Sequence, residues 1–368
     1  MRAIITGGGT GGHIYPALAV AEKMKEKGWE VLYLGSDYRM ESEIVPKAGF
    51  DFRGLSVRPL PRKISTEIIS SLFYNFRAFI RAIGLIRSFK ADIIIGTGGF
   101  VAGPVVLAGV LLGKNTVIHE QNAYPRITNK LLAKIVDRVC LNFPEAAEYL
   151  KVKPQKVKIT GNPVRPKILK VNRDQAYQEL NLNSELKTIL ITGGSLGAEV
   201  INQNVLKLYK YALQNKVQIL HLSGKKNYKS LIIELKKNNI NPENPLFKIM
   251  DYLNEMEYAL TAADLIIARA GATGLAEITS SKKASILIPF AGAAENHQLL
   301  NAQALQKNGA ALLIEESELN EQFLLEKVKS IIENEKKLKS MSEAAGKMSQ
   351  KESLTKLLNV IENLRLEN

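Results

Sequence analysis

A short apolar run that leads into a cluster of glycines occurs twice in this chain, and it constrains the fold more than any other feature. The segment Ala3-Ile4-Ile5-Thr6-Gly7-Gly8 is matched by Ile189-Leu190-Ile191-Thr192-Gly193-Gly194. A helical pattern follows each copy, so each half is expected to open with a strand, a glycine loop and a helix, as nucleotide-binding α/β domains do. The sequence therefore predicts two similar, doubly wound, Rossmann-like halves that face each other across a cleft.

Short β-rich runs alternate with longer helical patterns along the whole chain, which is typical of parallel sheets covered by helices on both faces. In the first half, strands are expected at residues 2–5, 30–34, 92–95, 115–119, 138–141 and 157–160. In the second half, strands are expected at residues 188–192, 217–222, 247–250, 265–268, 285–289 and 311–313. The tail from residue 320 onward is charged and helical in pattern.

The length of 368 residues favours two domains, each able to bury a full core. A polar stretch near residues 167–184, with Pro163 and Pro166 just before or at its edge, marks the expected hinge. We therefore expect a first domain over residues 1–162 and a second over residues 163–341. The C-terminal helix, residues 342–368, is expected to pack back on the first domain.

The net charge of +14 is concentrated in the first half of the chain. Residues 1–162 hold 23 Lys and Arg against 13 Asp and Glu, an excess of +10, while the remainder holds 27 against 23. Such a bias suggests an anionic partner, whether a nucleic acid, a phosphorylated substrate or an acidic membrane surface. No basic helix with base-stacking aromatics is present, so nucleic acid is not expected. The single cysteine, Cys140, suits a reducing compartment.

Two apolar segments resemble membrane signals. The first run enters glycines at Gly7 before a signal-peptide core could form, so the N-terminus is interpreted as a strand. Residues 93–113 are uncharged and about as long as a bilayer span. They contain six glycines and Pro104, which predicts a buried strand, a loop and an apolar helix inside an α/β core.

Glycine loops follow expected strands at residues 7–13, 96–100 and 193–198. A bare backbone at a helix N-terminus lets a phosphate approach closely, so three such loops favour a diphosphate site. The first loop fits G-x-G-x-x-G through Gly7, Gly9 and Gly12. At the end of the second expected strand, however, where a nicotinamide enzyme would want an acid for ribose, the chain has Gly35-Ser36 with Asp37 only nearby, and no Walker A lysine follows the loop.

His13 ends the first glycine loop, directly before an expected helix at residues 16–27. It is the histidine expected to be exposed in the cleft, where imidazole could serve as a general base; capping the helix or binding phosphate is the alternative. The run His119-Glu120-Gln121-Asn122 places four polar side chains after another strand, which indicates binding, and leaves open whether Glu120 or His13 is the base. No metal-ligand spacing and no Asp-x-Asp motif occur, so neither a metal nor a cofactor is expected.

In the second half, Arg269-Ala270-Gly271-Ala272 leads into a helix that carries Glu277. A carboxylate is suited to gripping paired ribose hydroxyls, while a helix N-terminus near Gly271 would stabilise diphosphate charge. Gln298 and Asn301 follow downstream, after Pro289-Phe290. Together these residues predict a nucleotide site in the second half.

A basic, strongly apolar helical pattern lies between residues 68 and 83. Its apolar positions exceed one core-facing stripe, and arginines are interleaved with them; the candidate membrane residues are Phe73, Phe76, Arg77, Ile80 and Arg81. Arg58, Arg62 and Lys63 come just before it. Such a patch suits anionic lipid headgroups, with a core helix bearing ordinary surface arginines as the alternative.

These motifs resemble the undecaprenyldiphospho-muramoylpentapeptide β-N-acetylglucosaminyltransferases, a family of bacterial peptidoglycan-synthesis enzymes with the two-domain GT-B glycosyltransferase fold. The resemblance spans nearly the whole chain. It rests on residues 8–13 and 119–122, on Gly161-Asn162-Pro163-Val164-Arg165, on Gly193-Gly194-Ser195 with Gly197-Ala198, and on Arg269, Gly271-Ala272, Glu277, His297-Gln298 and Asn301.

The resemblance implies an inverting transfer of N-acetylglucosamine from UDP-N-acetylglucosamine to the 4-hydroxyl of lipid-linked muramoyl-pentapeptide, at the cytoplasmic face of the membrane. It implies donor contacts at Thr10, Gly11, Gly12, Asn122, Arg165, Ser195, Leu253, Ala272, Thr273, Gly274, Leu275, Ala276, Glu277 and Gln298. The first domain would bind acceptor and membrane and the second the UDP-sugar, with Gly9, Gly98 and Gly99 admitting the acceptor diphosphate. Leu196, and Thr273-Gly274, depart from the residues usual in the family.

Three other functions fit parts of the pattern. A UDP-N-acetylglucosamine 2-epimerase would share the two-halved fold but has no need of the basic apolar patch. A nicotinamide oxidoreductase would use the first glycine loop for NAD. A non-enzymatic membrane or nucleic-acid binding protein would explain the charge and leave three glycine loops unused.

Overall fold

The computed structural model describes residues 1–59, 61, 67–194, 197–293 and 296–366. The chain forms two compact units, one comprising Met1–Val164 with Gln350–Asn368 and the other Arg165–Ser349. The division thus falls two residues beyond the expected one. The expected tail helix at 342–368 is two helices, α14 (Glu335–Met348) in the second unit and α15 (Ser353–Leu366) on the first.

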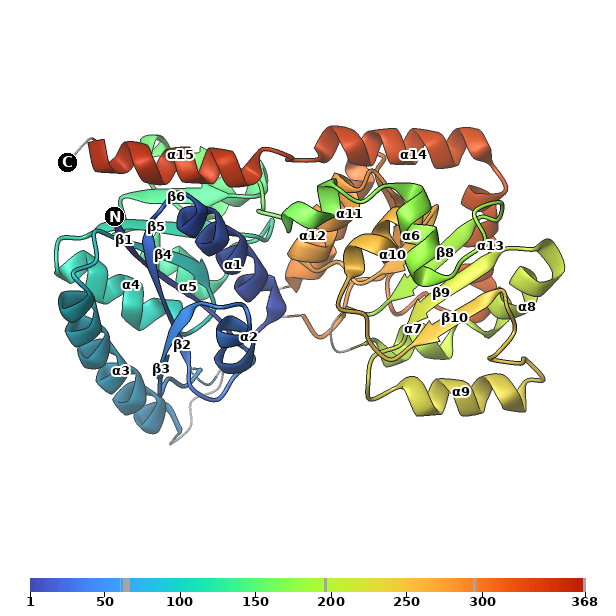
Figure 1. Ribbon diagram of the computed structural model, residues 1–368, viewed down its shortest axis with the longest axis horizontal. Helices are drawn as coiled ribbons and strands as arrows, with labels where there is room; N and C mark the ends of the chain where they lie inside the picture. Colours follow the sequence, from blue (N-terminus) through green and yellow to red (C-terminus); the bar gives the residue numbers. More distant parts are fainter. Residues whose placement is uncertain (60, 62–66, 195–196, 294–295, 367–368) are drawn as a thin grey trace. The chain divides into compact units, whose positions relative to one another are not determined.

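The first unit is built on a seven-stranded sheet, all of whose strand pairs are parallel, in the order β3-β2-β1-β4-β5-β6-β7 (Figure 1). The strands are β1 (Arg2–Gly7), β2 (Glu30–Ser36), β3 (Asp51–Leu55), β4 (Ile93–Gly98), β5 (Asn115–Glu120), β6 (Arg138–Leu141) and β7 (Val157–Ile159). Its helices, besides α15, are α1 (Gly11–Glu26), α2 (Glu41–Lys47), α3 (Glu67–Phe89), α4 (Ala102–Leu111) and α5 (Ile127–Leu132).

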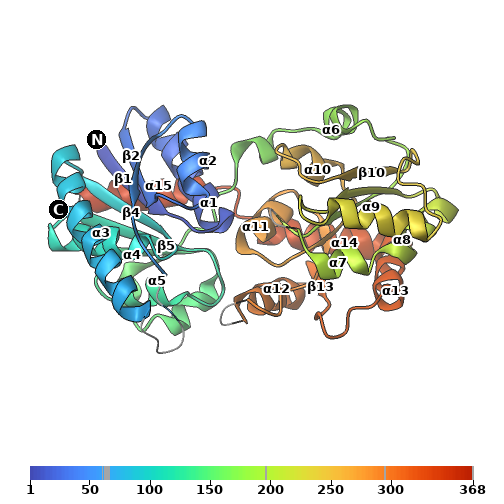
Figure 2. The same cartoon turned by 90° about the horizontal axis from the view of Figure 1, so that it is seen from below.

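Alternate residues of each central strand enter separate cores on the two faces of this sheet. Ile5 and Ile95 pack with α1 and α15, whereas Ile4 and Ile94 pack with α3, α4 and α5. Figure 2 shows these helices on opposite faces of the sheet. Apolar residues at consecutive positions are what a strand buried on both faces requires.

The C-terminal helix α15 is held against the first unit by close packing at its start. The Ser353 hydroxyl donates to the Asn162 carbonyl oxygen at 3.0 Å. Gly161 has φ +78°, and a Cβ there would lie 2.3 Å from Cβ of Gln350. Only glycine therefore lets the chain pass so close to the start of α15.

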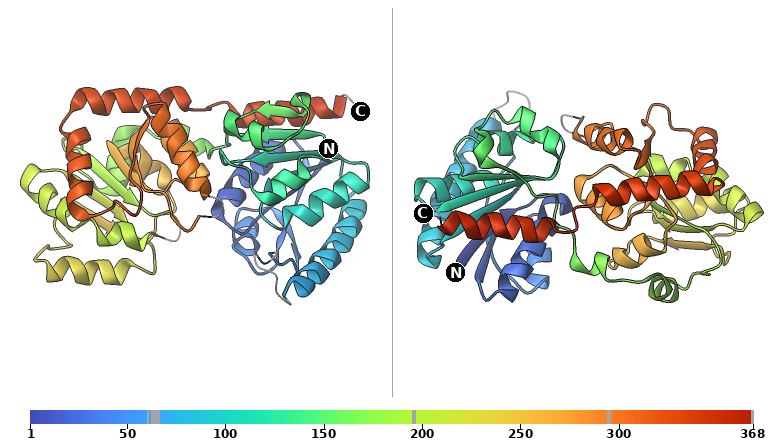
Figure 3. Two further views of the ribbon diagram at one scale, coloured as in Figure 1. Left: turned by 180° about the vertical axis from the view of Figure 1, so that it is seen from behind. Right: turned by 90° about the horizontal axis from the view of Figure 1, so that it is seen from above.

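The second unit is built on a six-stranded parallel sheet of the equivalent order, β10-β9-β8-β11-β12-β13. Figure 3 gives two further views of this unit, which is coloured from green to red. The strands are β8 (Thr188–Thr192), β9 (Gln218–Leu222), β10 (Phe247–Met250), β11 (Leu265–Ala268), β12 (Ala284–Leu287) and β13 (Ala311–Leu313). Its helices, besides α14, are α6 (Arg173–Leu180), α7 (Glu199–Gln203), α8 (Leu206–Asn215), α9 (Tyr228–Lys237), α10 (Met256–Ala262), α11 (Ala272–Ser280), α12 (His297–Lys307) and α13 (Glu321–Ile332).

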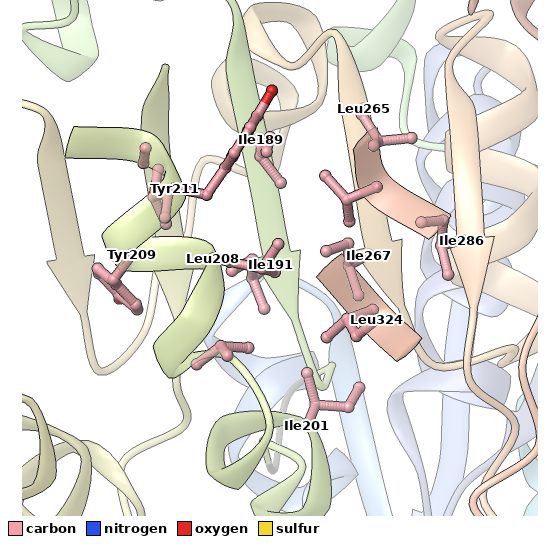
Figure 4. Packing of buried hydrophobic residues seen from close by; sticks show 14 of the residues in the cluster. Ile189, Ile191, Ile201, Leu208, Tyr209, Tyr211, Leu265, Ile267, Ile286 and Leu324 are labelled. Atoms are coloured by element: carbon pink, nitrogen blue, oxygen red, sulfur yellow. The ribbon is translucent and has the colours of Figure 1, made fainter. Parts of the chain in front are cut away.

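The core on one face of this second sheet is formed by isoleucines from neighbouring strands. Ile189, Ile191, Ile267 and Ile286 pack with Leu324 of α13 and with residues of α7 and α8 (Figure 4). The opposite face is covered by α10, which contacts β8 and whose buried Ala259 and Leu260 are not part of this core. The second sheet is thus also doubly wound.

The fold expected from the sequence is confirmed, and each strand expected from the sequence is present. Residues 93–113 form strand β4 and helix α4, as expected. Strand β3 was missed; it is the edge strand beside β2, and only Leu55 among its residues is fully buried.

Candidate active site

The glycine loops lie where the strand order of each sheet reverses. In the first sheet, β1 and β4 are neighbours at the reversal and end at Gly7 and Gly98. In the second, β8 and β11 end directly before Gly193 and Arg269. Open parallel sheets bind ligands outside the carboxyl ends of strands at such a switch point. Each unit therefore offers one binding position.

The first two glycine loops pack directly against each other. The Gly8 N–H donates to the Gly98 carbonyl oxygen at 3.2 Å. A Cβ at Gly99 would lie 2.3 Å from the Gly8 carbonyl oxygen, and both Gly98 and Gly99 have positive φ, +107° and +84°. Close packing of loops and left-handed backbone therefore account for Gly98 and Gly99 without a ligand, and their contact with an acceptor diphosphate stays a prediction.

A carboxylate that the sequence interpretation missed lies against the first glycine loop. Glu41, at the start of α2, is fully buried; its Oε2 accepts from Gly9 N at 2.9 Å and its Oε1 from Ser36 N at 3.1 Å. A diphosphate could reach the Gly9 amide only by displacing this carboxylate. The contact expected between Gly9 and an acceptor diphosphate therefore stays a prediction. The N-terminus of α1 lies next in the loop, starting at Gly11 after the exposed N-cap residue Thr10.

His13 lies in the first turn of α1, whereas the sequence placed it before the helix and exposed. Its exposed fraction is 5%. Nδ1 lies 3.0 Å from the Thr97 carbonyl oxygen and 3.0 Å from Oε1 of Gln121. Both of these atoms are acceptors, so Nδ1 carries the hydrogen, and in the neutral ring Nε2 carries the lone pair that a general base uses.

The polar run after β5 binds its own loop. Glu120 is fully buried, and its Oε1 accepts from N and Nδ2 of Asn122, both at 2.9 Å, while Oε2 accepts from Nδ2 of Asn129 at 2.8 Å and from Arg126 N at 3.1 Å. Burial raises the pKa of Glu120, against the lowering effect of these hydrogen bonds. Both oxygens are occupied, so the geometry gives Glu120 a role in holding the loop, and whether Glu120 or His13 is the base stays a prediction.

Arg165 and Glu277, both expected donor ligands, form an ion pair within the second unit. Nε and Nη2 of Arg165 each lie 3.1 Å from Oε1 of Glu277, and Nη1 lies 3.8 Å from Oε2 of Glu257. Burial raises the pKa of Glu277, and Arg165 opposes that rise. Residues 272–277 form the start of helix α11, whose N-cap residue is Gly271.

Arg269 ties together the loops that follow β11, β12 and β13. Its Nη1 donates to the carbonyl oxygens of Ile288 and Pro289 at 3.1 and 3.3 Å and lies 2.5 Å from Oε1 of Glu316. Gln298 accepts from Phe290 N at 3.0 Å through its Oε1.

Of the other expected donor ligands in the second unit, Leu253 is half-buried in the loop after β10, and Ala272, Leu275 and Glu277 are buried. Thr273 and Ala276 are half-buried, and Gly274 is exposed. Ser195 and Leu196 lie outside the described residues.

The apolar pattern of residues 68–83 lies on helix α3, whose length and hydropathy alone would allow it to cross a membrane. One side of the helix packs into the first core through Ala78, Ala82 and Ile86. The other side exposes the side chains of Ile69, Leu72, Phe73, Phe76 and Ile80 together with Arg77 and Arg81, with Phe76 62% exposed. Arg62 and Lys63 lie outside the described residues.

A second group of exposed apolar side chains was missed by the sequence interpretation. Leu107 and Leu111 on α4, and Ile127 and Leu131 on α5, are exposed. Helix α4 contacts both α3 and α5, so the two groups belong to neighbouring helices (Figure 2). We call the exposed apolar residues of α3, α4 and α5 the apolar surface. Contiguous apolar patches mark interaction sites.

Within the described ranges, no cluster of three or more His, Cys, Asp and Glu side chains is placed to hold a metal ion. Cys140 is buried in the first unit, and burial raises the pKa of its thiol to about 12. Neither feature adds a group to the site.

Two parallel-sheet domains with a glycine loop at each switch point define the GT-B class of two-domain nucleotide-sugar enzymes. Residues 3–141 match the model of the glycosyltransferase family 28 N-terminal domain, and residues 188–358 match that of the family 28 C-terminal domain. The chain belongs to glycosyltransferase family 28.

Curated relatives match over the full length. A UDP-N-acetylglucosamine--N-acetylmuramyl-(pentapeptide) pyrophosphoryl-undecaprenol N-acetylglucosamine transferase of Halothermothrix orenii is 48% identical, with 99% of each chain covered. A protein of the same name from Desulforamulus reducens is 43% identical, again with 99% of each chain covered.

Among solved structures, the MurG of Acinetobacter baumannii has a TM-score of 0.76 at 27% identity, over 98% of this chain and 99% of that one. A putative UDP-N-acetylglucosamine 2-epimerase from Listeria monocytogenes has a TM-score of 0.74 at 14% identity, over 100% of this chain and 97% of that one. This second likeness concerns the fold alone.

Proposed function

We propose that this chain transfers N-acetylglucosamine from UDP-N-acetylglucosamine to the 4-hydroxyl of undecaprenyl-diphospho-N-acetylmuramoyl-pentapeptide, with inversion at the anomeric carbon. The observation that carries the proposal is the full-length similarity, up to 48% identity, to relatives named for this transfer. The two nucleotide-type switch points provide the binding positions that a two-substrate reaction needs.

The second unit binds the donor. The N-terminus of α11 carries a partial positive charge that suits the diphosphate, and Arg165 adds a full one. A carboxylate accepts through two oxygens, so Glu277 can hold Arg165 through Oε1 while its other oxygen accepts a ribose hydroxyl. Arg165 thus supplies a positive charge to the diphosphate, and Glu277 supplies a hydrogen-bond acceptor to the ribose.

The first unit binds the acceptor and supplies the base. Nε2 of His13 takes the proton of the acceptor hydroxyl as the oxygen attacks the anomeric carbon. The bond from that carbon to the UDP oxygen breaks, and UDP leaves with the electron pair. Arg165 and the helix N-termini stabilise the charge that develops on the diphosphate.

The chain docks peripherally on the cytoplasmic face of the cell membrane through the apolar surface. The exposed side of α3 alternates aromatic and arginine side chains, which is the composition of helices that lie in the interface of anionic bilayers. The opposite side of α3 is anchored in the core by Ala78, Ala82 and Ile86, which supports lying on the membrane over crossing it. Docking would bring the first unit to a lipid-linked acceptor.

A UDP-N-acetylglucosamine 2-epimerase is the second candidate, because the fold is shared. Incubation with UDP-N-acetylglucosamine, with and without a short-chain lipid-linked muramoyl-pentapeptide, separates the two. Transfer predicts that UDP is released only when the acceptor is present, and that the nucleotide sugar alone stays unchanged. Formation of UDP-N-acetylmannosamine without acceptor would support the epimerase and contradict the proposal.

A further inference from the structure

Two buried histidines of the first unit are joined through one glutamine side chain. Nε2 of Gln121 lies 2.7 Å from the Thr97 carbonyl oxygen and 3.0 Å from Nδ1 of His119, and Oε1 of Gln121 lies 3.0 Å from Nδ1 of His13. Nε2 of His119 lies 2.8 Å from the Gly161 carbonyl oxygen. All three side chains are at most 5% exposed.

Backbone carbonyls fix the orientation of the Gln121 amide and the ring nitrogen of each histidine that carries hydrogen. The two hydrogens on Nε2 of Gln121 are shared among three acceptors, the carbonyl oxygens of Thr97 and His119 and Nδ1 of His119. A carbonyl oxygen can only accept, so the atom of Gln121 that faces Thr97 must be the amide nitrogen, and the amide cannot be flipped. Oε1 of Gln121 must then accept from His13, which puts a hydrogen on Nδ1 of His13. The Thr97 carbonyl, also 3.0 Å from that Nδ1, requires the same hydrogen independently.

His119 must hold its hydrogen on the opposite nitrogen. The Gly161 carbonyl oxygen accepts from Nε2, which leaves Nδ1 of His119 to accept from Gln121. Burial lowers the pKa of His119 to about 4, so this ring is neutral at physiological pH and can be donor and acceptor at once.

We propose that Gln121, held by the Thr97 carbonyl and by His119, is a positioning residue that fixes the tautomer and ring orientation of His13. The geometry assigns an Nδ1-hydrogen tautomer to His13 and an Nε2-hydrogen tautomer to His119. This assignment rests on the proposed function only in its consequence for turnover. Hydrogen-bond partners that fix the tautomer of a functional imidazole are a recurrent requirement in proteins.

The tautomers can be read by nitrogen NMR of the full chain labelled with [15N]histidine, at pH 8 and without substrate. Only four histidines are present, and substitutions of His13, His221 and His297 by Gln assign all four. The expected result is opposite tautomers in His13 and His119. The same tautomer in both rings, or a hydrogen on Nε2 of His13, would overturn the proposal.

The variant Gln121→Met removes the amide while keeping the length of the side chain. We expect the nitrogen NMR signals of His13 to show a mixture of its two tautomers. We also expect kcat to be roughly 10- to 100-fold lower, because a misplaced base loses much of its effect. The Michaelis constant for UDP-N-acetylglucosamine should stay within about twofold. A kcat and a His13 signal that both match the wild-type chain would overturn the proposal.

Gln218→Met is the matched control. Gln218 is also a buried glutamine, but it lies in the second unit, where it bonds to Asn183 and Thr188. It should keep both the tautomer pattern and kcat; an equal loss of kcat would make the effect a general cost of removing a buried amide and overturn the proposal.

The two claims fail separately. If the tautomers are opposite and His13→Ala retains turnover, the base assignment fails and the positioning network stands. If His13→Ala abolishes turnover and the tautomers are alike, the positioning network fails and the base assignment stands.

Discussion

Arg165 is held by Glu277 through a single oxygen, with Nε and Nη2 of the guanidinium each 3.1 Å from Oε1. The carboxylate is 9% exposed, and Asn254 adds its carbonyl oxygen 3.3 Å from Nη1 of the arginine. Arg165 is the first residue of the second unit, so the pair anchors the start of this unit to helix α11. Two residues expected to bind separate parts of the donor are therefore coupled to each other.

This coupling makes Glu277→Gln a test of the donor site. The change keeps the shape of the side chain but removes the charge that orients Arg165 and weakens the acceptor for ribose. Hydrogen bonds to charged groups contribute about 1.5–3 kcal/mol, so the Michaelis constant for UDP-N-acetylglucosamine should rise roughly 10- to 100-fold. Steady-state kinetics at saturating acceptor measures it.

Glu257→Gln is the matched control for that change. Its Oε2 lies 3.8 Å from Nη1 of Arg165, a longer and less direct contact. Because 3.8 Å is beyond hydrogen-bond distance, the rise in the Michaelis constant should be about threefold or less. Equal Michaelis constants in wild type and Glu277→Gln would remove Glu277 from the donor site.

His13→Ala tests the proposed base. General-base catalysis typically contributes about 10²- to 10⁴-fold, so kcat should fall by that factor with a near-normal donor Michaelis constant. Circular dichroism should show an intact fold, since α1 keeps its backbone hydrogen bonds. Near-normal turnover at saturating substrates would contradict the assignment.

The strands could be predicted because they are buried on both faces and therefore read as continuous apolar runs, as in Ile93–Gly98. Strand β3 could not be predicted in this way, because it lies at the edge of the sheet and has no continuous apolar run. Exposed positions such as Asp51 and Arg53 alternate there with partly buried ones. The break between α14 and α15 has no glycine or proline to signal it. It arises where Gln350 packs on Gly161, a contact between residues far apart in the chain.

The candidate site was predicted as a set of loops but not as a hydrogen-bond network. His13 was expected to be exposed at the end of a glycine loop, yet Thr97 at the end of β4 and Gln121 after β5 bond to it and it is buried. Glu41 gave no local signal, because its partner Gly9 is 32 residues away. Burial of polar groups depends on tertiary contacts that a periodic pattern does not contain.

Membrane docking is tested by the double variant Phe76→Glu with Arg81→Glu. The changes place two carboxylates on the exposed side of α3, where they repel anionic headgroups and remove apolar contact area. Sedimentation with vesicles that contain phosphatidylglycerol should show at least a tenfold loss of binding, while activity on a soluble short-chain acceptor is retained.

Ile233→Glu with Lys237→Glu is the control for docking. Both residues lie on α9 of the second unit, and Ile233 is 54% exposed. This variant should bind the vesicles as wild type does. Equal vesicle binding by wild type and the α3 variant would argue against docking through the apolar surface.

Glu41→Gln tests the role of the buried carboxylate at the first glycine loop. The amide side chain can accept from only one of the two N–H groups, Gly9 or Ser36, and presents a donor to the other. We expect the free energy of unfolding of the first unit to fall by about 1–3 kcal/mol, measured by urea denaturation.

Glu43→Gln, two residues further on, is the surface control for Glu41→Gln. Its carboxylate is exposed and pairs with Lys47 at 3.9 Å, so the change should stay within about 0.5 kcal/mol. An equally small effect of Glu41→Gln would show that the glycine loop does not depend on this carboxylate.

The most direct test of the proposed transfer is the structure of the product formed from labelled UDP-N-acetylglucosamine and a short-chain lipid-linked muramoyl-pentapeptide. Proton NMR of the isolated glycolipid gives the linkage position and the anomeric configuration. The single displacement assisted by His13 predicts a β-linked N-acetylglucosamine on the 4-hydroxyl of the muramoyl sugar. An α-linked product, or release of UDP without transfer to the acceptor, would contradict it.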